Sequence, residues 1–391
     1  MNELMVVAGE ASGDMHAARV VKILKKELSQ LRITGMGGSE LSRLGQQQLV
    51  NKGDGSFGLG GALTSLPRHL RRAHLLLKRA EEGDVDLALL VDYSGFNMYL
   101  ARGLRRRNVP VVHYIPPTAW CWGRWRAKWL ARQEVTVAAI FPRERDLYRE
   151  AGAEVEYVGH PLLDEISSPY DQRQCRQQLE GIIQNKGGEV LDPGEKVMAL
   201  LPGSRPEEIR SLLRPMLAAA RRLQEKHYLR PVIAVRPEDT KRVKKLLGQQ
   251  LAEEVELIGG HTRTVMGGAD LGLIASGSAT LEAALIGCPQ IVLYKADRLT
   301  ALAARLFLRT EHIALPNIIA GREVVPELVQ KDVKDDIIYS RAAELLEDEE
   351  AILSQQEGYN QIREELGSPG AAGRTAELVL KKGGFRSAGG D

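Results

Sequence analysis

The sequence predicts an α/β fold in which two doubly wound, Rossmann-like parallel sheets are followed by C-terminal helices. Three observations support this. Short apolar runs that end in Gly-rich turns and lead into helical patterns recur along the chain, which is the alternation of a parallel sheet. The alternation loosens over residues 167–196 and then begins again. With 391 residues, the chain is also longer than one hydrophobic core usually fills, so two domains are expected.

The first series of elements predicts an N-terminal domain over residues 1–166. The strand in "LMVVAGE" (residues 4–10) leads into a helix near residues 14–31. Further along, "VDLALLVDYSG" (85–95) leads into the helical stretch "FNMYLARGLRRR" (96–107). The other strands and turns predicted in this half lie in "ITGMGG" (33–38), "VPVVHYIPP" (109–117) and "VTVAAIFPRE" (135–144).

The second series predicts a C-terminal domain over residues 197–345. Residues 167–196 are expected to form a linker with one short helix. Residues 346–391 read as helices and a Gly-containing tail, which we expect to pack back on the N-terminal domain or on a partner subunit. The second series consists of "VMALLPGSR" (197–205), "RPVIAVRPE" (230–238), "VELIGG" (255–260), "ADLGLIASGSATLEAALIG" (269–287) and "CPQIVLYKA" (288–296).

Composition limits the classes of function. Hydrophobic residues make up 43% of the chain and charged residues 27%, as in soluble globular proteins. The net charge of +2 does not indicate nucleic-acid binding. Cys121, Cys175 and Cys288 have neither metal nor disulfide spacing, so no metal is expected and a reducing cytoplasm is indicated. No long apolar span and no signal-peptide pattern occurs, so any membrane contact would be peripheral.

The motif "GEASGDMHA" (residues 9–17) follows the first predicted strand. Open α/β sheets bind ligands at the carboxyl ends of their strands, so polar side chains here are candidates for catalysis. A capped strand-to-helix turn with no further role is the alternative. The candidate catalytic residues of the motif are Glu10, Asp14 and His16. The candidate binding residues, which would let a substrate approach the backbone and helix amides, are Gly9, Ser12 and Gly13.

Asp92 is a further candidate for the general base, because it ends the apolar run "LALLV" (residues 87–91). A carboxylate at the end of a buried strand is well placed to accept a proton. It could equally close the turn that follows. The residues alone leave both interpretations open.

The second predicted domain carries two motifs suited to a diphosphate. In "LLPGSRPEEI" (residues 200–209), Gly203 and Ser204 turn the chain before Arg205. Arginine can clamp a diphosphate with two hydrogen bonds, although pairing with a nearby glutamate is the alternative. In "ASGSATLEAAL" (275–285), a turn precedes a helix whose first amides can bind an anion. The turn consists of Ser276, Gly277, Ser278, Ala279 and Thr280, and Glu282 beyond it could cap the helix or hold a ribose.

Two basic and apolar segments are candidates for contact with a membrane surface. Trp122, Trp125 and Trp129 recur at helical spacing among basic residues, and core packing is the alternative. The helical stretch "PRHLRRAHLLLKRA" (67–80), with Arg71 and Arg72, is the second candidate. The segment "GDGSFG" (53–58) has the spacing of a dinucleotide fingerprint without its flanking strand and helix, so a Gly-rich loop is favoured.

Ten motifs, in order along nearly the whole chain, resemble those of the lipid-A-disaccharide synthases. They are "GEASGDMHA", "GMGG", "VDYSGFN", "HYIPPTAWCW", "FPRE", "YVGHPLLD", "LLPGSRPEEI", "ASGSATLE", "LPNIIAGREVVPELVQ" and "SPGAAGRTAELV". The resemblance implies a GT-B fold, with two Rossmann-like domains facing across a cleft. It also places Asn317, Arg322 and Glu327 near the nucleotide-sugar.

The activity that the resemblance implies is an inverting glycosyl transfer. The donor is UDP-2,3-diacylglucosamine, and the acceptor is the acylated glucosamine lipid 2,3-diacylglucosamine 1-phosphate. The products are the β-1,6-linked disaccharide 1-phosphate and UDP. The family needs no metal or other cofactor and works on the inner face of the cytoplasmic membrane. The resemblance also suggests a homodimer that exchanges C-terminal segments.

One departure from the family pattern affects the choice of base. Many members carry a second acid after the turn, where this chain has Gly95. We therefore predict that Asp92 acts as the base, with the acids and histidine of "GEASGDMHA" as the second choice. Two other functions remain open: another GT-B enzyme acting on UDP-N-acetylglucosamine, or a non-catalytic relative that binds lipid or nucleotide.

Overall fold

The computed structural model describes residues 2–50, 62–83, 85–119, 123–249, 251, 255–296 and 311–385, with the backbone alone for residues 62–66. The chain divides into two compact units. The N-terminal unit comprises Met1–Glu165 and Leu366–Asp391, and the C-terminal unit comprises Ile166–Glu365. The chain therefore passes between the units twice, at residues 165–166 and 365–366.

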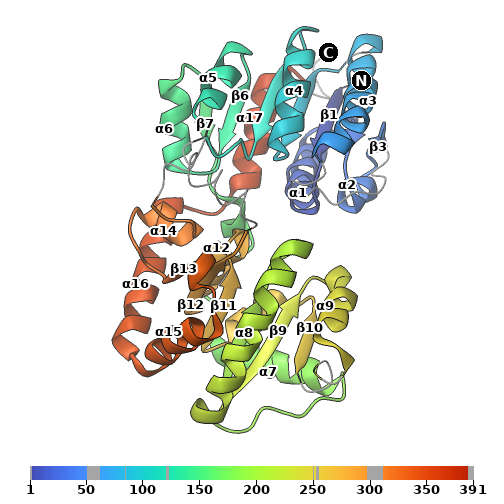
Figure 1. Cartoon of the computed structure of the whole chain (residues 1–391). Helices are drawn as coiled ribbons and strands as arrows, with labels where there is room; N and C mark the ends of the chain where they lie inside the picture. Colours follow the sequence, from blue (N-terminus) through green and yellow to red (C-terminus); the bar gives the residue numbers. More distant parts are fainter. Residues whose placement is uncertain are drawn as a thin grey trace. The chain divides into compact units, whose positions relative to one another are not determined.

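The described part of the N-terminal unit contains a seven-stranded parallel sheet (Figure 1). The apolar runs form its strands, because strands that are buried on both faces of a parallel sheet read as continuous hydrophobic segments. In spatial order the strands are β3 (Gln47–Gln48), β2 (Arg32–Met36), β1 (Glu3–Ala8), β4 (Leu87–Val91), β5 (Val111–Tyr114), β6 (Thr136–Ala139) and β7 (Val155–Tyr157).

Helices follow these strands in the alternation that the sequence predicts. The longer helices α1 and α4 bury apolar stripes; in α4, for example, Phe96, Leu100 and Leu104 recur at helical spacing and are buried. Before the chain leaves this unit, the helices are α1 (Ala11–Glu27), α2 (Ser39–Arg43), α3 (Ala62–Glu82), α4 (Ser94–Arg105), α5 (Trp125–Arg132), α6 (Pro142–Glu150) and the 3-10 helix η2 (Pro161–Asp164).

The last described helix, α17 (Ala371–Gly383), belongs to the N-terminal unit. Figure 1 shows it in red among the blue and green elements, and it packs on α1. The Asp164 carboxylate holds its first turn by accepting hydrogen bonds from the amides of Ala371 (3.1 Å) and Ala372 (3.0 Å). Tyr157 Oη also donates to the Leu366 carbonyl at 2.6 Å. The first and last parts of the chain thus form one core.

The described part of the C-terminal unit contains a six-stranded parallel sheet. On one face, α8 covers it with a stripe that includes Ile209, Leu213 and Leu217, all buried. In spatial order the strands are β10 (Glu256–Gly259), β9 (Leu229–Val235), β8 (Lys196–Leu201), β11 (Leu271–Ala275), β12 (Gln290–Tyr294) and β13 (Glu327–Val329). The helical elements are α7 (Gln172–Gln184), α8 (Pro206–His227), η3 (Pro237–Asp239), α9 (Thr240–Leu247), α11 (Thr262–Gly268), α12 (Ser278–Ile286), α14 (Leu315–Ala320), η4 (Gln330–Asp332), α15 (Asp335–Glu347) and α16 (Glu349–Leu366).

The segment expected to be a linker, residues 167–196, contains α7 and belongs to the C-terminal unit. Cys175, Leu179 and Ile183 recur every four residues and are buried, and Asp171 caps the helix by accepting from the Gln174 amide at 2.8 Å. Five glutamines in this helix obscure the apolar stripe in the sequence. The helix packs on α11, so this segment is part of the fold.

Candidate active site

Both sheets contain the reversal of strand order that creates a binding position in doubly wound folds. In the N-terminal unit β1 lies between β2 and β4, and in the C-terminal unit β8 lies between β9 and β11. Ligands of such folds bind beyond the carboxyl ends of the strands at this reversal. Glu10 follows β1 and Asp92 follows β4. In the other unit, Arg205 follows β8 and Ser276 follows β11.

Asp92 stands directly after β4 in an uncommon backbone conformation. Its φ is +51°, and that of Tyr93 is +49°, a left-handed region that non-Gly residues seldom adopt. Its carbonyl accepts hydrogen bonds from Asn97 Nδ2 (2.7 Å) and from His113 Nε2 (3.2 Å), and its amide donates to the Tyr114 carbonyl (2.9 Å). These bonds hold a strained turn in place, and such strain is concentrated at functional sites.

The ionisation of Asp92 suits a general base. Burial, followed by the negative charge of Glu10, raises the pKa of its carboxyl group from 3.8 to about 6, while the Tyr93 amide acts in the opposite direction. Burial lowers the pKa of His113 beneath it to about 4, so this histidine is neutral near pH 7. A carboxylate with a pKa close to the working pH combines ionisation with affinity for a proton.

The position after the turn does not supply a second acid. Gly95 is exposed in the first turn of α4, and a Cβ added to it would meet nothing within 4 Å. An aspartate therefore fits at this position without steric cost. Within the described turn, Asp92 is the one carboxylate.

The two glycines of "GEASGDMHA" have different surroundings. A Cβ on Gly9 would lie 2.3 Å from the ring of Tyr93, so this glycine is needed for the ring to pack against the β1–α1 turn. Tyr93 also stacks on Phe96, with 5.3 Å between ring centroids. A Cβ on Gly13 would make ordinary contacts, among them one of 3.8 Å to Asp92 Cβ. The turn after β1 and the turn after β4 therefore lie side by side.

Asp14 has a structural task in this arrangement. It is buried, and its carboxylate accepts hydrogen bonds from the amides of Gly38 (2.6 Å), Glu40 (3.0 Å) and Leu41 (3.3 Å). These amides begin α2, so Asp14 is the cap of that helix from a distant part of the chain. Its contacts favour support of the fold over proton transfer.

We expect Asp14→Ala to lower the free energy of unfolding of the N-terminal unit by about 2 kcal/mol, because three amides lose a charged acceptor. Urea denaturation followed by circular dichroism measures this. Asp348→Ala is the matched control, since Asp348 caps α16 through one hydrogen bond, at 2.9 Å to the Ala351 amide, and should cost less. Equal losses in the two variants would contradict the capping role.

The other residues of this motif differ in exposure. Glu10 and Ser12 are exposed at the start of α1, on the side of the strand end. His16 is buried and lies 3.8 Å from Glu165, which pairs with Arg19 at 2.8 Å. The structure thus brings Glu10 near Asp92. It places His16 in a different cluster, with Arg19 and Glu165.

In the C-terminal unit, the turn after β8 presents Arg205 to solvent. Its Nη1 donates to Glu208 at 3.2 Å, and the amides of Ser204 and Arg205 both donate to the same carboxylate at 3.2 Å. Gly203 has a φ of +102°, and a Cβ there would collide with Glu208 Oε2 at 2.6 Å. The pairing of Arg205 with a nearby glutamate is therefore present, and a diphosphate would compete with Glu208 for the guanidinium.

The turn after β11 lies beside the turn after β8, since a Cβ on Gly203 would be 3.3 Å from Ala275 Cβ. Ser276 Oγ donates to the Ile313 carbonyl (3.0 Å), and Thr280 Oγ1 donates to the Gly277 carbonyl (2.8 Å). Gly277 and Ser278 are exposed, and Ala279 is partly so. Glu282 is bound by Arg263 Nε at 2.7 Å, so it holds a neighbouring helix.

Asn317 and Glu327 organise the segment that reaches this edge. Asn317 is fully buried and makes four hydrogen bonds, including 2.8 Å to the Val325 carbonyl and 2.8 Å to Glu327. Glu327 also accepts from the amides of Ile313 and Ala314, both at 3.0 Å. The two residues shape the backbone beside Ser276. Arg322 instead lies exposed and donates to Gln361 at 2.6 Å.

Sequence reasoning missed three residues at these edges. Arg236 follows β9 and donates to the Ser204 carbonyl at 2.7 Å, which places a second guanidinium beside the turn after β8. Tyr93 and His69 form a hydrogen bond of 2.6 Å beside Asp92. An arginine directly after the apolar run "PVIAV" was a detectable signal for Arg236, whereas the Tyr93–His69 contact has no local signature.

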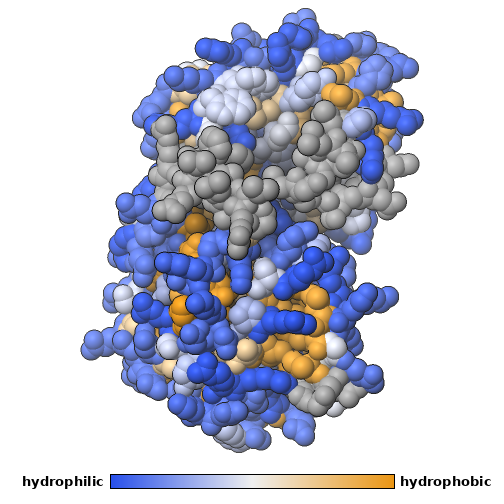
Figure 2. Space-filling view, viewed as in Figure 1, coloured by the Kyte–Doolittle hydropathy of each residue, from blue (hydrophilic) through white to orange (hydrophobic). Residues whose placement is uncertain are grey.

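The candidate membrane residues separate into different environments. Trp125 is 61% exposed, with the Arg126 guanidinium 5.7 Å from its ring centroid, whereas Trp129 packs against the core. Arg71 is exposed and Arg72 is half-buried. Trp122 and the segment 53–58 lie outside the described residues. Figure 2 shows hydrophobic residues next to strongly hydrophilic ones in the region where Figure 1 draws α3 and α4.

Within the described ranges, no cluster of three or more His, Cys, Asp or Glu side chains has the arrangement of a metal site. None of the described helices combines the length and apolar character needed to cross a bilayer.

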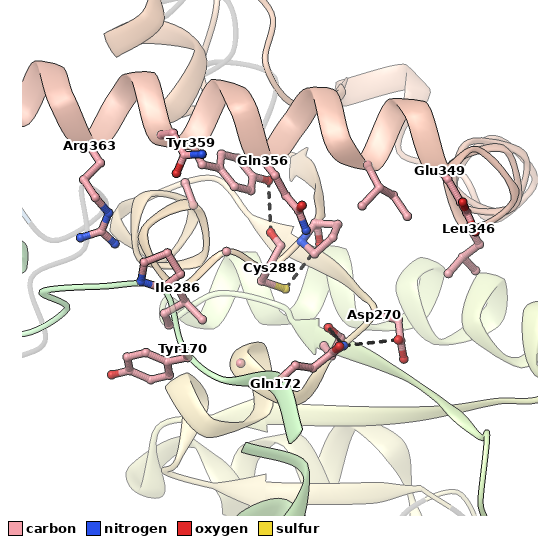
Figure 3. A pocket seen from close by; sticks show the side chains of 18 of the residues that line it. Tyr170, Gln172, Asp270, Ile286, Cys288, Leu346, Glu349, Gln356, Tyr359 and Arg363 are labelled. Carbon is pink, nitrogen blue, oxygen red and sulfur yellow. Dashed lines mark hydrogen bonds between the residues drawn. The ribbon is translucent and has the colours of Figure 1, made fainter. Parts of the chain in front are cut away.

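A cavity of about 500 Å³ lies at the opposite edge of the C-terminal sheet (Figure 3). Its lining includes Lys196, Asp270 and Pro289, which stand at the amino ends of β8, β11 and β12. Tyr359 from α16 closes one side and donates to the Cys288 carbonyl at 3.1 Å. The cavity is thus separate from the carboxyl edge that carries Arg205 and Ser276.

The two sheets and their carboxyl-edge sites define a GT-B-like architecture, the class to which many glycosyltransferases belong, and confirm the predicted fold class. The fold is similar to that of the UDP-GlcNAc 2-epimerase from Neisseria meningitidis bound to UDP-GlcNAc, with a TM-score of 0.63, 16% identity and coverage of 97% of this chain and 100% of that one. A glycosyltransferase from Rickettsia africae gives a TM-score of 0.55 at 13% identity, covering 97% of this chain and 98% of that one. At these identities the likeness establishes the fold alone.

Sequence comparison identifies the family. The family model described as lipid-A-disaccharide synthetase matches residues 4–381. The lipid-A-disaccharide synthase of Anaeromyxobacter dehalogenans is 37% identical over 382 residues, which is 97% of each chain. That of Syntrophus aciditrophicus is 37% identical over 389 residues, covering 96% of this chain and 97% of the relative. The chain belongs to the lipid-A-disaccharide synthase family of glycosyltransferases.

Proposed function

We propose that this enzyme transfers 2,3-diacylglucosamine from UDP-2,3-diacylglucosamine to the 6-hydroxyl of 2,3-diacylglucosamine 1-phosphate. Inversion at the anomeric carbon gives the β-1,6-linked disaccharide 1-phosphate and UDP. The observation that carries this proposal is the match to one family along the whole chain. The distribution of charge supports it, because the base candidate follows β4 and the diphosphate-binding candidates follow β8 and β11.

The acceptor is held by the N-terminal unit. The Asp92 carboxylate takes the proton of the 6-hydroxyl while that oxygen forms its bond to the anomeric carbon of the donor. The raised pKa of Asp92, about 6, leaves it ionised at neutral pH and gives it more affinity for the proton than an ordinary aspartate has. Glu10 acts through its charge on Asp92.

The donor is held by the C-terminal unit. As the anomeric C–O bond breaks, its electron pair leaves with UDP, and the diphosphate gains negative charge. Arg205 and the amides at the exposed start of α12 stabilise that charge, so the reaction proceeds without a metal. Asn317 and Glu327 are positioning residues, because their hydrogen bonds fix the backbone beside Ser276.

The acylated substrates come from a bilayer, and the enzyme works peripherally at the inner face of the cytoplasmic membrane. Leu70 and Leu75 are 45% and 41% exposed beside Arg71 on α3, which suits an interface of acyl chains and anionic headgroups. Co-sedimentation with anionic vesicles tests this contact.

A homodimer that exchanges C-terminal segments would replace each α17 by its partner's copy. Size-exclusion chromatography with light scattering tests that assembly.

Mass spectrometry of the reaction mixture, after chromatography that separates isomeric sugar nucleotides, tests the proposed activity. The purified enzyme is incubated with UDP-diacylglucosamine and the acylated monosaccharide phosphate, and a parallel sample contains UDP-N-acetylglucosamine alone. We expect disaccharide 1-phosphate and UDP in the first sample, with or without a chelator, and no change in the second. Epimerised or hydrolysed sugar nucleotide in the second sample alone would indicate a different GT-B enzyme. UDP binding without turnover would indicate a non-catalytic relative.

Gly95→Asp tests the environment of the base. The substitution restores the second acid of other family members in a space free of steric contact. A negative charge introduced into the first turn of α4 should raise the pKa of Asp92 further, so the rise of activity with pH should begin at higher pH. The pH dependence of kcat/KM for the variant and the parent measures this. A rise of kcat/KM that begins at lower pH in the variant than in the parent would contradict this prediction.

A further inference from the structure

One face of α3 meets the site of Asp92. His69 Nε2 lies 2.6 Å from Tyr93 Oη, and its ring is 6.0 Å from that of Phe96. Farther along the same helix, Arg79 Nε donates to Glu3, the first residue of β1, at 2.9 Å. The helix thus runs along the sheet from the carboxyl edge at His69 to the amino edge at Arg79.

Arg72 stands on the same face as His69. Residues three apart on a helix are neighbours, and Arg72 is only about 4.5 Å farther along the axis. It is half-buried, and its charge acts on the hydroxyl of Tyr93. Arg72 therefore lies at the carboxyl edge, unlike Arg71, which is exposed next to Leu70.

Tyr93 is a rigid link between this face and Asp92. Its backbone is left-handed, with a φ of +49°, and its ring is fixed between Gly9 and Phe96. Burial raises the pKa of the Tyr93 hydroxyl, so it remains protonated. An imidazole and a guanidinium are thus gathered around the phenol of Tyr93, the residue next to the candidate base.

The negative charges at this edge mean that an anionic substrate group needs a cation beside it. Two carboxylates meet at this edge, and the negative charge of Glu10 disfavours ionisation of Asp92. A substrate with a phosphate monoester would be repelled here unless a cation faced that phosphate. Guanidinium binds phosphate with paired, charge-assisted hydrogen bonds, and a phenol or imidazole can add a further donor.

We propose that Arg72, together with His69 and Tyr93, binds the anomeric phosphate of the acceptor and selects phosphorylated acceptors over unphosphorylated ones. This inference rests on the proposed function. The acceptor reacts at its 6-hydroxyl, carried by C5 through C6, and carries its phosphate at the anomeric carbon, on the other side of the ring oxygen. In the protein, Asp92 and the His69–Arg72 face of α3 are likewise separated, by the side chain of Tyr93. The 6-hydroxyl can therefore face Asp92 while the phosphate faces α3.

Two acceptors that differ only in this phosphate test the proposal. The values of kcat/KM for 2,3-diacylglucosamine 1-phosphate and for 2,3-diacylglucosamine are compared in non-ionic detergent, without phospholipid. In Arg72→Gln we expect the preference for the phosphorylated acceptor to fall about 10- to 100-fold, the usual scale for a hydrogen bond to a charged group. Arg72→Lys, which keeps the charge and loses the fork, should retain an intermediate preference. Lys78→Gln, which removes an exposed cation farther along the same helix, is the matched control and should leave the preference unchanged.

The outcomes separate the two proposals. No disaccharide from the parent enzyme with either acceptor would overturn the proposed function, and this inference with it. Turnover by the parent with the same preference in Arg72→Gln would overturn the inference alone. A loss in Arg72→Gln that is equal for both acceptors, or that occurs only with anionic vesicles, would show a structural or phospholipid-headgroup role and also overturn it. Retained UDP binding shows that a variant is folded. If Arg72→Gln does not fold, His69→Asn replaces it, because this variant should also lower the preference for the phosphorylated acceptor.

Discussion

Asp92→Asn is expected to lower kcat by about 10²-fold or more, with little change in UDP binding. The amide keeps the size and hydrogen bonding of the side chain but cannot accept the proton of the acceptor hydroxyl, and loss of a general base usually costs this much. Single-turnover kinetics with saturating donor and acceptor measure the effect on the chemical step. A rate near that of the parent would remove Asp92 from the mechanism.

The same substitution should stabilise the fold, which separates loss of the base from misfolding. Because the folded state raises the pKa of Asp92 to about 6, the ionised carboxylate destabilises that state above the unfolded pKa of 3.8. Removing it should add at most about 3 kcal/mol to the free energy of unfolding at pH 8, and nothing below about pH 3.8, where the aspartate is protonated in both states. Urea denaturation at the two pH values measures the difference.

The pH dependence of activity follows from the same shift. Activity should rise with pH through about 6 as Asp92 loses its proton. Glu10→Gln is the control, because removing its charge lowers the pKa of Asp92 and should move this rise to lower pH. An unchanged profile in Glu10→Gln would show that another group controls the acidic limb.

Arg205→Ala is expected to lower kcat by about 10²- to 10³-fold and to weaken UDP binding, because the departing diphosphate loses its guanidinium. Calorimetry with UDP and steady-state kinetics separate the two effects. Arg205→Lys should recover part of the loss, since a lysine keeps the charge without the two parallel donors. Arg210→Ala removes an exposed arginine from the same helix and should leave both quantities unchanged. Unchanged kinetics in Arg205→Ala would refute its role.

Local patterns in the sequence predict the strands and the turns that carry these two residues. Strands buried on both faces are continuous apolar runs, and the residue after such a run must lie at the carboxyl edge of its sheet. This reasoning placed Asp92 and Arg205 without any knowledge of their partners. Pairing of Arg205 with a nearby glutamate, Glu207 or Glu208, was the alternative, and the structure shows it with Glu208.

What the sequence could not predict depends on distant partners. Asp14 read as a catalytic candidate, and its role as a cap appears only when α2, some 25 residues later, is placed above it. Asn317 and Glu327 likewise read as ligands, yet they bind backbone groups of a loop whose shape no local pattern encodes. A short helix was expected within residues 167–196, but its packing on α11 as part of the C-terminal unit depends on a partner about 90 residues later.

The position of α17 imposes an order on the synthesis of this protein. On the ribosome, Asp164 and the surface of α1 emerge more than 200 residues before the helix that they bind. The C-terminal unit is one continuous segment, Ile166–Glu365, and has all its residues available earlier than the N-terminal unit does. The domain that is translated first is therefore the last to be completed. A nascent chain that stalls or is cleaved before residue 371 would lack the helix that packs on α1, and the Asp164 carboxylate would be without the amides that it binds in the complete fold.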